Sequence, residues 1–266
     1  MPHRRSGLLV AAMLAAPLLA AVPCAAQTTA PAGAAVPALD PDAIRAVERM
    51  GKALRALPYF TLRADTITDY VLDDGQKVSL SGTVDYKVLG TDRFFVEIQS
   101  EQQHRQLFYD GHALTLYAPR LKYYATLDGL DRSTQALLAD SAAAYGVEFP
   151  LADLFLWGTD AFPTDRFQSA LAVGTTRIDG DPTHHYAYRL PGVDWQVWVS
   201  DSTQLPRRLV ITSHNDPALP DYQATLRWDT RRAVTAAELT FRPDGATRIV
   251  FVPVDTGAQA SVQGGE

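Results

Sequence analysis

The sequence predicts an α+β protein in which helices cover the apolar face of a large antiparallel sheet. Three observations indicate this class: an amphipathic helical stripe near the N-terminus, alternating apolar and polar residues along many later segments, and Asp-Gly pairs between those segments. Clean alternation is typical of antiparallel strands with one solvated face, because buried parallel strands are apolar on both faces.

Residues 1–26 are expected to form an export signal that is removed. Arg4 and Arg5 make a short basic start, and the apolar run Gly7–Val22 follows. Small residues then lead to a cleavage site after Ala26, as is typical of secretory signal peptides. The mature chain is therefore expected in the periplasm of a Gram-negative cell, without a stable transmembrane segment.

A membrane anchor and a lipid attachment site are the alternative interpretations of this leader. A spanning helix needs about 20 continuous apolar residues, and Pro17 and Pro23 interrupt the run. Cys24 is the residue to which a lipid would be attached, although Pro23 directly before it fits a lipoprotein cleavage site badly. Cleavage after Ala26 would remove Cys24, the only cysteine, and with it any disulfide or thiol chemistry.

The charge composition excludes some partners. The chain has 24 Lys and Arg against 30 Asp and Glu, a formal net charge of −6, and its basic residues are not clustered. Nucleic-acid-binding proteins carry a basic patch, so no nucleic-acid partner is expected. An acidic chain is not drawn to anionic lipid by charge either, so any membrane contact would be hydrophobic or made through a protein partner.

Residues 27–39 are rich in Ala and Pro and are expected to be a disordered linker. A helix is predicted directly after them, because Asp40 is a suitable N-cap, Pro41 suits the first helical position, and Pro58 ends the pattern. Apolar residues recur at spacings of three and four, which makes one stripe of an amphipathic helix. The stripe consists of Ile44, Val47, Met50, Leu54 and Leu57.

The period of the pattern changes to two after this helix. Successive side chains of a strand point to opposite faces of a sheet, so alternation predicts strands with one dry and one wet face. Matching to this pattern gives about eleven strands. They include KVSLSGTVDYKV, RFFVEIQSE, QLFY, ALTLYAP, KYYATL, LAVGTTRI, HHYAYRL, DWQVWVS, RRLVITSH, DYQATLRWD and ELTFR.

Asp-Gly pairs lie between several of these strands, and such pairs are the strongest short-range signal for a hairpin. A two-residue loop at Asp110–Gly111 would place Leu107 opposite Leu114 and Tyr109 opposite His112. The other pairs are Asp74–Gly75 and Asp179–Gly180. The turns therefore agree with a sheet built from consecutive hairpins.

The strands are interrupted between Asp128 and Phe167. The segment DRSTQALLADSAAAYG is predicted to be a helix that ends at Gly146, and PLADLFLWG a second helix that begins at Pro150. A sheet of this size needs a cover on its apolar face, and we expect these two helices and the N-terminal one to supply part of it. Residues 255–266 are polar and are expected to be a disordered tail.

The sequence contains no nucleophile elbow, HExxH zinc motif, P-loop or dinucleotide fingerprint. His184 and His185 are adjacent on a predicted strand, face opposite sides of the sheet, and are not expected to share a metal ion. No combination of nucleophile, base and orienting residue is recognisable. The expectation is a protein that is not an enzyme and has no catalytic residues, no metal and no cofactor.

Three segments together resemble the periplasmic lipoprotein carrier LolA and its relatives, including the LppX-like lipid carriers. They are SGTVDYKVLGTDRFFVEI, FYDGHALTLYAP and AELTFRPDGA, and their order and spacing match across residues 40–254. The chain as a whole resembles a family of predicted periplasmic proteins, a domain of unknown function with this carrier-like fold. The resemblance implies one domain, an incomplete antiparallel half-barrel whose helices form a lid over an apolar cavity.

One turn departs from the pattern of the lipoprotein carriers. These carriers have an Arg-Pro turn after the Ser-Gly-Thr strand, and the arginine latches the lid. Here the turn is Val88–Thr91, and Lys87 is the nearest basic residue. The resemblance therefore implies the cavity but not the latch, nor the cargo transfer that depends on the latch.

The sequence thus favours a periplasmic binding or carrier protein for an apolar ligand, such as a lipid acyl chain or a lipoprotein. The alternative is a structural or interaction protein of the cell envelope that has a filled core and a protein partner. Apolar sheet and lid residues are the candidates for lining a ligand cavity, since ligand sites are concave and mostly apolar. They are Leu80, Val84, Tyr86, Phe94, Val96, Ile98, Leu151, Leu154, Phe155, Trp195, Leu226 and Trp228.

Overall fold

The structure is a computed structural model that describes most of the chain after residue 38. The described residues are 39–90, 92–130, 137, 147, 149–151, 156–157, 159 and 162–251. The expected signal peptide, linker and tail lie outside them, as do Leu154, Phe155 and nearly all of the helix expected to end at Gly146.

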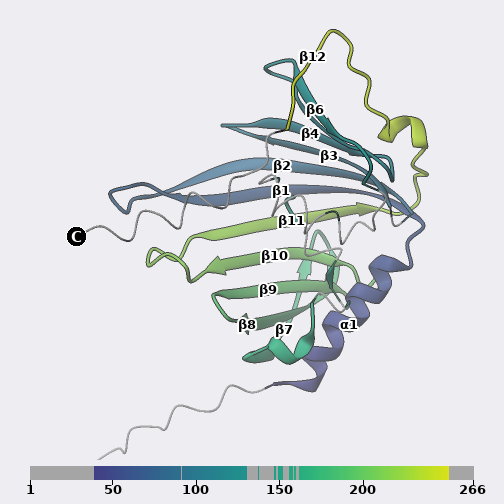
Figure 1. The fold of residues 1–266 in the computed structure, drawn as a ribbon. Coiled ribbons are helices and arrows are strands. Elements are labelled where there is room, and N and C mark those ends of the chain that lie inside the picture. Colours follow the sequence, from purple (N-terminus) through teal and green to yellow (C-terminus); the bar gives the residue numbers. More distant parts are fainter. Residues whose placement is uncertain are drawn as a thin grey trace, which may run out of the picture. The chain divides into compact units, whose positions relative to one another are not determined.

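In the described residues the fold is mostly β, an open curved sheet of twelve strands with one α-helix (Figure 1). The strand order is β12-β6-β5-β4-β3-β2-β1-β11-β10-β9-β8-β7, and all neighbours are antiparallel except β12 and β6. The sheet is therefore two consecutive meanders, β1–β6 and β7–β11, joined by the pairing of β1 with β11. The strands are β1 Tyr59–Val71, β2 Lys77–Leu89, β3 Arg93–Ser100, β4 His104–Tyr109, β5 Leu114–Ala118, β6 Tyr123–Leu127, β7 Ser169–Ile178, β8 Asp181–Leu190, β9 Val193–Ser200, β10 Pro206–Ser213, β11 Asp221–Asp229 and β12 Thr247–Arg248.

The helix α1 (Pro41–Arg55) confirms the helix predicted from the apolar stripe. The Asp40 side chain caps it by accepting the backbone N–H of Asp42 at 2.8 Å, and Pro41 occupies the first turn. The helix lies against one face of the sheet (Figure 1), and its buried residues belong to the same core as those of the strands. Within the described residues, no helix is both long and apolar enough to cross a membrane.

We call the sheet face that α1 covers the inner face. Strand register places Leu62, Tyr86, Val96 and Leu107 side by side on it, and each is buried. The same core continues across β11, β10, β9 and β8. Their residues on the inner face are Ala224, Leu226, Trp228, Leu209, Trp195, Val197, Val199, Tyr186 and Tyr188.

The opposite, outer face is polar along its centre, where Arg63 pairs with Asp85. Near β3–β6 it is covered by residues that follow β11. There, the short 3₁₀ helix η2 (Ala236–Leu239) packs Leu239 against Phe95, and Phe241 contacts three aromatic rings. Those rings belong to Phe108, Tyr117 and Tyr124.

The prediction that ELTFR forms a strand is wrong, because these residues form the end of η2 and an irregular segment. The carboxylate of Glu238 accepts the backbone N–H of Thr235 at 3.1 Å, which favours a helical turn at this point. Phe241 then packs on the outer face rather than within a strand pair. The described residues nevertheless contain twelve strands, because β1 and β12 form in addition to the other segments predicted from the sequence.

The predicted register of the hairpin at Asp110 is also wrong by two residues. Tyr109 pairs with Leu114, and Leu107 pairs with Leu116, so the loop contains four residues. The Asp110 carboxylate accepts the backbone N–H groups of His112 and Ala113, at 2.9 and 2.8 Å, and these bonds stabilise the longer loop.

The helix predicted to begin at Pro150 does not begin there. Pro150 and Leu151 form a turn, and Leu151 has a φ of +61°, in the left-handed region. Leu151 is nevertheless buried in the core. Its apolar side chain therefore helps to cover the inner face from a turn and not from a helix.

Candidate ligand-binding pockets

The residues predicted to line a cavity lie mostly in the packed core of the inner face. Most are buried, whereas Leu80 and Trp228 are half-buried. The buried members are Val84, Tyr86, Phe94, Val96, Ile98, Leu151, Trp195 and Leu226.

Residues that follow β6 cover the inner face. The hydroxyl of Tyr86 donates to the carbonyl of Pro150, and that of Tyr109 donates to the carbonyl of Leu130. The ring of Phe149 packs edge-on against Phe94, with centroids 5.7 Å apart. In the described part of the chain, the centre of this face is thus filled by the protein's own side chains.

A small pocket, which we call the Trp195 pocket, lies at the β9–β10 part of the inner face. Its volume is about 100 Å³, and every side chain that lines it is apolar or aromatic. The indole N–H of Trp195 is buried and has no hydrogen-bond partner among the residues that the structure describes. The lining residues are Trp157, Phe162, Leu190, Val193, Trp195, Leu209 and Ile211.

A second small pocket brings together three of the predicted residues, Leu80, Val84 and Ile98. Its volume is about 60 Å³, and Pro150 and Tyr222 also line it. Polar side chains such as those of Thr66, Gln99 and Gln103 contribute the remaining lining. This pocket is therefore more mixed in character than the Trp195 pocket.

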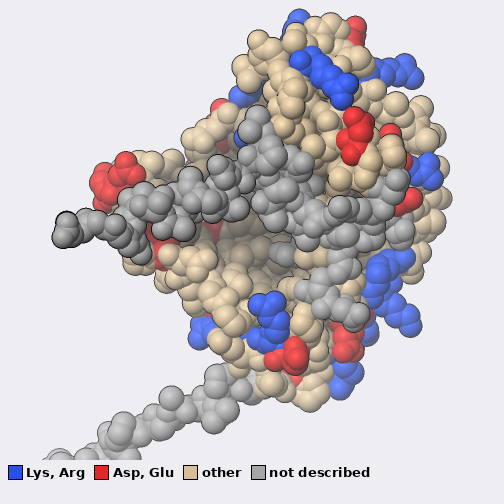
Figure 2. Space-filling view, viewed as in Figure 1, with Lys and Arg blue, Asp and Glu red and all other residues tan. Residues whose placement is uncertain are grey.

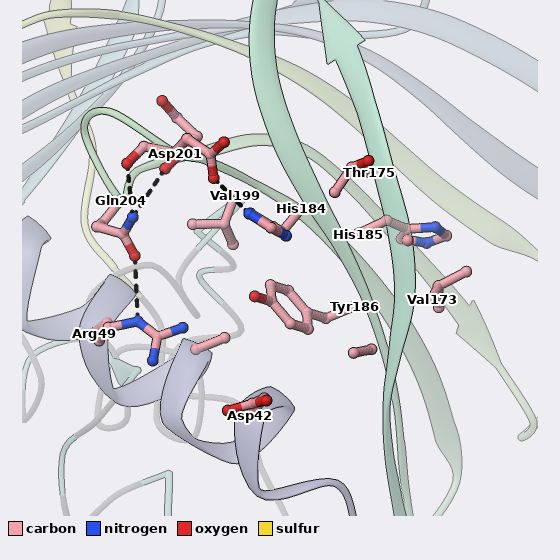
Figure 3. A pocket seen from close by; sticks show the side chains of 14 residues that line it. Asp42, Arg49, Val173, Thr175, His184, His185, Tyr186, Val199, Asp201 and Gln204 are labelled. Carbon is pink, nitrogen blue, oxygen red and sulfur yellow. Dashed lines mark hydrogen bonds and ion pairs between the residues drawn. The ribbon is translucent and has the colours of Figure 1, made fainter.

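A larger pocket of about 480 Å³, which we call the Arg49 pocket, lies between α1, β7, β8 and the turn after β9 (Figure 3). Its principal polar side chains are those of Asp42, Arg49, His184, Asp201 and Gln204. Its other lining residues are Ala46, Ala172, Val173, Gly174, Thr175, His185, Tyr186, Val199 and Ser200.

The polar groups of the Arg49 pocket are linked around its rim. Nε2 of His184 lies 2.6 Å from the Asp201 carboxylate, and Nε of Arg49 donates to Gln204 Oε1 at 3.4 Å. Burial raises the pKa of the Tyr186 phenol, although the neighbouring Arg49 opposes this shift. The Tyr186 hydroxyl therefore stays protonated at neutral pH and is available as a donor.

The side chains of His184 and His185 point to opposite sides of β8, as predicted. The ring of His185 points away from the Arg49 pocket (Figure 3) and stacks on Trp198 at a centroid distance of 4.0 Å. Burial lowers the pKa of His185, which also hydrogen-bonds to Gln196. Among the described residues, no three His, Cys, Asp or Glu side chains form a group that could hold a metal ion.

The Arg49 pocket has little signature in the sequence. Its polar residues come from a helix, a strand and a turn, and their spacing along the chain follows no local motif. In the sequence, His184 stands out only as a candidate metal ligand beside His185. The strand prediction contained one usable signal, since it placed His184 and Tyr186 on the same face of β8.

Surface charge does not single out one pocket. Figure 2 shows Lys, Arg, Asp and Glu side chains scattered around the margin of the visible face, with both signs of charge interspersed. Ion pairs hold many of these charges, such as Arg189 with Asp194 and Lys77 with Asp69. Surface pairs of this kind contribute little to stability individually.

An open antiparallel sheet with a helix packed on its apolar face, and with pockets at the edges of that packing, defines the structural class of this protein. The chain belongs to the family described as predicted periplasmic protein (DUF2092), whose sequence profile matches residues 43–252. This match confirms the resemblance to a family of predicted periplasmic proteins. A comparison with curated proteins gives no match.

The chain is also similar to several solved structures. It is 14% identical to the lipoprotein LppX of Mycobacterium tuberculosis, with a TM-score of 0.48 over 74% of this chain and 100% of that one. It is 14% identical to LprF of Mycobacterium bovis, with a TM-score of 0.43 over 74% and 96% of the two chains. It is 15% identical to a chain of the Pseudomonas aeruginosa MucA/MucB complex, with a TM-score of 0.42, over 76% of this chain and only 61% of that chain.

Proposed function

We propose that this protein is a non-enzymatic binding or carrier protein of the periplasm for an apolar ligand, such as an acyl chain of a lipid or a lipoprotein. Export with cleavage after Ala26 is part of this proposal. The observation that carries it is a pocket lined only by apolar and aromatic residues, one of which, Trp195, has a buried indole N–H without a hydrogen-bond partner among the described residues.

The Trp195 pocket suits an apolar group that carries a hydrogen-bond acceptor. An unpaired buried donor costs about 1–3 kcal/mol, and a ligand carbonyl beside Nε1 would remove that cost. The apolar lining adds about 0.8 kcal/mol for each methylene group that it removes from water. A ketone, ester or amide joined to an alkyl chain combines both features.

The volume limits what the pocket holds. About 100 Å³ is roughly three times the ~30 Å³ that one water molecule occupies in the liquid. The pocket therefore takes a short part of a ligand. A longer acyl chain requires neighbouring side chains such as Phe162 to move, and the energy of binding then includes the cost of that movement.

Two measurements test this proposal. Native mass spectrometry of the protein purified from the periplasm should detect a bound lipid. In addition, 2-octanone should displace a fluorescent apolar probe, N-phenyl-1-naphthylamine, better than octane does. Trp195→Phe, which removes the donor, should reduce that difference, whereas Trp198→Phe on the outer face should preserve it. A protein that is empty and that binds neither compound would contradict the proposal.

The proposed protein is not an enzyme. His184 and Asp201 are the pair of side chains most similar to a catalytic base and its orienting carboxylate, but they lack a nucleophile in the part of the chain that the structure describes. Within the described residues, the only hydrogen bond of the His184 ring goes to Asp201, and no hydroxyl group joins it. A nucleophile within hydrogen-bond reach of its base is the feature expected of nucleophilic catalysis. Purified protein should therefore leave p-nitrophenyl ester substrates intact.

The alternative function, an envelope interaction protein with a filled core, is favoured by a different observation. Strand β7 is the last strand in the sheet order, and its Leu171 and Val173 side chains are exposed. Open strand edges readily pair with another chain. Crosslinking in the periplasm through residue 173 should recover a protein partner if this alternative holds, and no partner if the protein binds only small ligands.

A further inference from the structure

We infer that the Arg49 pocket binds the carboxylate of a small ligand whose remaining part is aliphatic. This site is separate from the Trp195 pocket, so the inference goes beyond the proposed function and stands without it.

The size and lining of the Arg49 pocket suit a small organic ligand. Ligand pockets typically measure about 300–1,000 Å³ and combine an apolar lining with a few convergent polar groups. At about 480 Å³ the Arg49 pocket lies in this range. Its apolar lining comes from α1, β7 and β9 and includes Ala46, Ala172 and Val199.

Arg49 supplies a positive charge that forms no ion pair with a carboxylate in the described part of the chain. The two carboxylates that line the pocket have other partners, since Asp42 pairs with Arg45 and Asp201 pairs with His184. Among the described residues, Arg49 forms no ion pair, and its bond to Gln204 is long at 3.4 Å. A guanidinium group with free N–H donors matches the two oxygens of a carboxylate.

Tyr186 supplies a neutral donor beside this charge. Its side chain is 7% exposed, and its hydroxyl points into the space between Arg49 and His184 (Figure 3). Burial raises the pKa of the phenol, so it keeps its proton at neutral pH and can donate it to a ligand oxygen. One ligand carboxylate can therefore accept from the guanidinium and from the phenol at the same time.

The remaining charges select the ligand class. Asp42 and Asp201 on the rim would repel a phosphate dianion more than a single carboxylate, and they leave no place for a second negative group. The apolar side chains beside Tyr186 favour a ligand whose carbon chain follows its carboxylate directly. A fatty acid of medium length, such as octanoate, has this pattern.

Isothermal titration with three ligands of equal chain length tests the inference on the full mature chain. Octanoate should bind, 1-octanol should bind about tenfold or more weakly, and octylammonium should not bind, because only octanoate satisfies Arg49. Acetate should bind more weakly than octanoate, since it lacks the aliphatic part.

Variants locate the site. Arg49→Gln should weaken octanoate binding about tenfold or more, and Tyr186→Phe should weaken it by a smaller factor, because the phenol contributes one neutral donor. Lys52→Gln removes a positive charge from the same helix outside the pocket and should leave the affinity unchanged. Thermal unfolding of each variant shows whether it is folded. Arg49→Lys keeps the positive charge but loses the planar guanidinium group that can bind both carboxylate oxygens. Its affinity for octanoate should lie between those of the parent and Arg49→Gln.

The inference is overturned if the folded parent protein ignores octanoate, if octylammonium binds as well as octanoate, or if Arg49→Gln binds octanoate like the parent. Trp195→Phe separates this site from the proposed function. It should leave octanoate binding unchanged, even if it abolishes the preference for 2-octanone over octane.

Discussion

Tyr188 stacks on Trp195 with ring centroids 4.1 Å apart and planes inclined by 17°, and its hydroxyl donates to the backbone carbonyl of Ala43 at 2.7 Å. One side chain thus links the inner face of β8 and β9 to α1. Burial raises the pKa of Tyr188, so the phenol stays protonated and keeps this hydrogen bond over the range in which the protein is handled. The helix position therefore depends on a specific bond as well as on apolar packing.

Tyr188→Phe should lower the free energy of unfolding by about 1 kcal/mol, because it removes the bond to Ala43 and keeps the stacked ring. Tyr188→Ala should cost about 3–5 kcal/mol, since it also leaves a cavity beside Trp195. Urea unfolding measures both. Tyr123→Phe at the exposed end of β6 is the control and should have little effect. If Tyr188→Phe and Tyr123→Phe lowered the free energy of unfolding equally, the result would argue against the hydrogen bond from Tyr188 to Ala43.

Gly51→Ala should destabilise the protein, although Ala is favoured over Gly by about 1 kcal/mol in the interior of a helix. A Cβ at position 51 would overlap the carbonyl oxygen of Trp157, which also accepts a bond from Arg55. The measurement is the midpoint of thermal unfolding. Lys52→Ala, at the next and exposed position, should leave that midpoint nearly unchanged. A rise in the midpoint of Gly51→Ala would mean that the close approach to Trp157 does not exist in solution.

Asp40→Ala should lower the free energy of unfolding by about 1 kcal/mol, because it removes the N-cap of α1. Asp40 Oδ2 also accepts the backbone N–H of Ala172 at 3.4 Å, so the same substitution weakens the contact between the helix start and β7. Asp40→Asn should retain most of the stability, since Asn is an equally good cap. Urea unfolding compares the two, and an Asn variant as unstable as the Ala variant would count against capping as the cause.

Glu238 should give the stability a specific dependence on pH. Hydrogen bonds from Arg232 and from the backbone of Thr235 lower the pKa of Glu238 from its usual 4.5 to about 2. A lowered pKa in the folded state stabilises the fold above pH 4.5, and this contribution disappears as the pH falls from 4.5 to about 2. Glu238→Gln should therefore be less stable than the parent at pH 7 and should approach it near pH 2.

Chemical unfolding at a series of pH values checks this expectation. Glu48→Gln is the matched control, because Glu48 is exposed on α1 and forms no ion pair in the part of the chain that the structure describes. The difference between parent and Glu48→Gln should stay constant across the same pH values. If the difference in stability between the parent and Glu238→Gln were also constant across these pH values, Arg232 and Thr235 would not be lowering the pKa of the Glu238 carboxylate.

Local patterns predicted the strands of the sheet well, because a period of two depends only on neighbouring residues. The alternation of Val84, Tyr86 and Val88 places all three on the buried face, as the structure has them. The hairpin register failed because the side chain of Asp110 binds two backbone N–H groups and thereby supports a four-residue loop. The spacing T-A-A-E at Thr235–Glu238 was a readable signal for a helical turn that the apparent alternation of ELTFR obscured.

The pockets were much less predictable than the strands. Apolar residues that fill a core and those that line a cavity follow the same sequence pattern, so Phe94 and Leu80 could not be told apart. Phe94 lies in filled core, whereas Leu80 lines a small pocket. Arg49 and Tyr186 line the same pocket because α1 packs against the inner face at β8. This packing joins residues far apart in the sequence, so a pattern of neighbouring residues does not predict it.

The pairing of β1 with β11 has a consequence for how the chain reaches its final state. Each meander can form from hairpins between neighbouring strands, but the ladder from Thr61–Asp229 to Thr68–Tyr222 joins residues from opposite ends of the domain. Contacts of such long sequence separation form slowly. Until they form, β1 and β11 are open edges that can pair with other chains. Dilute refolding should therefore succeed where concentrated refolding aggregates, and a newly made chain stays vulnerable until β11 is available to pair with β1.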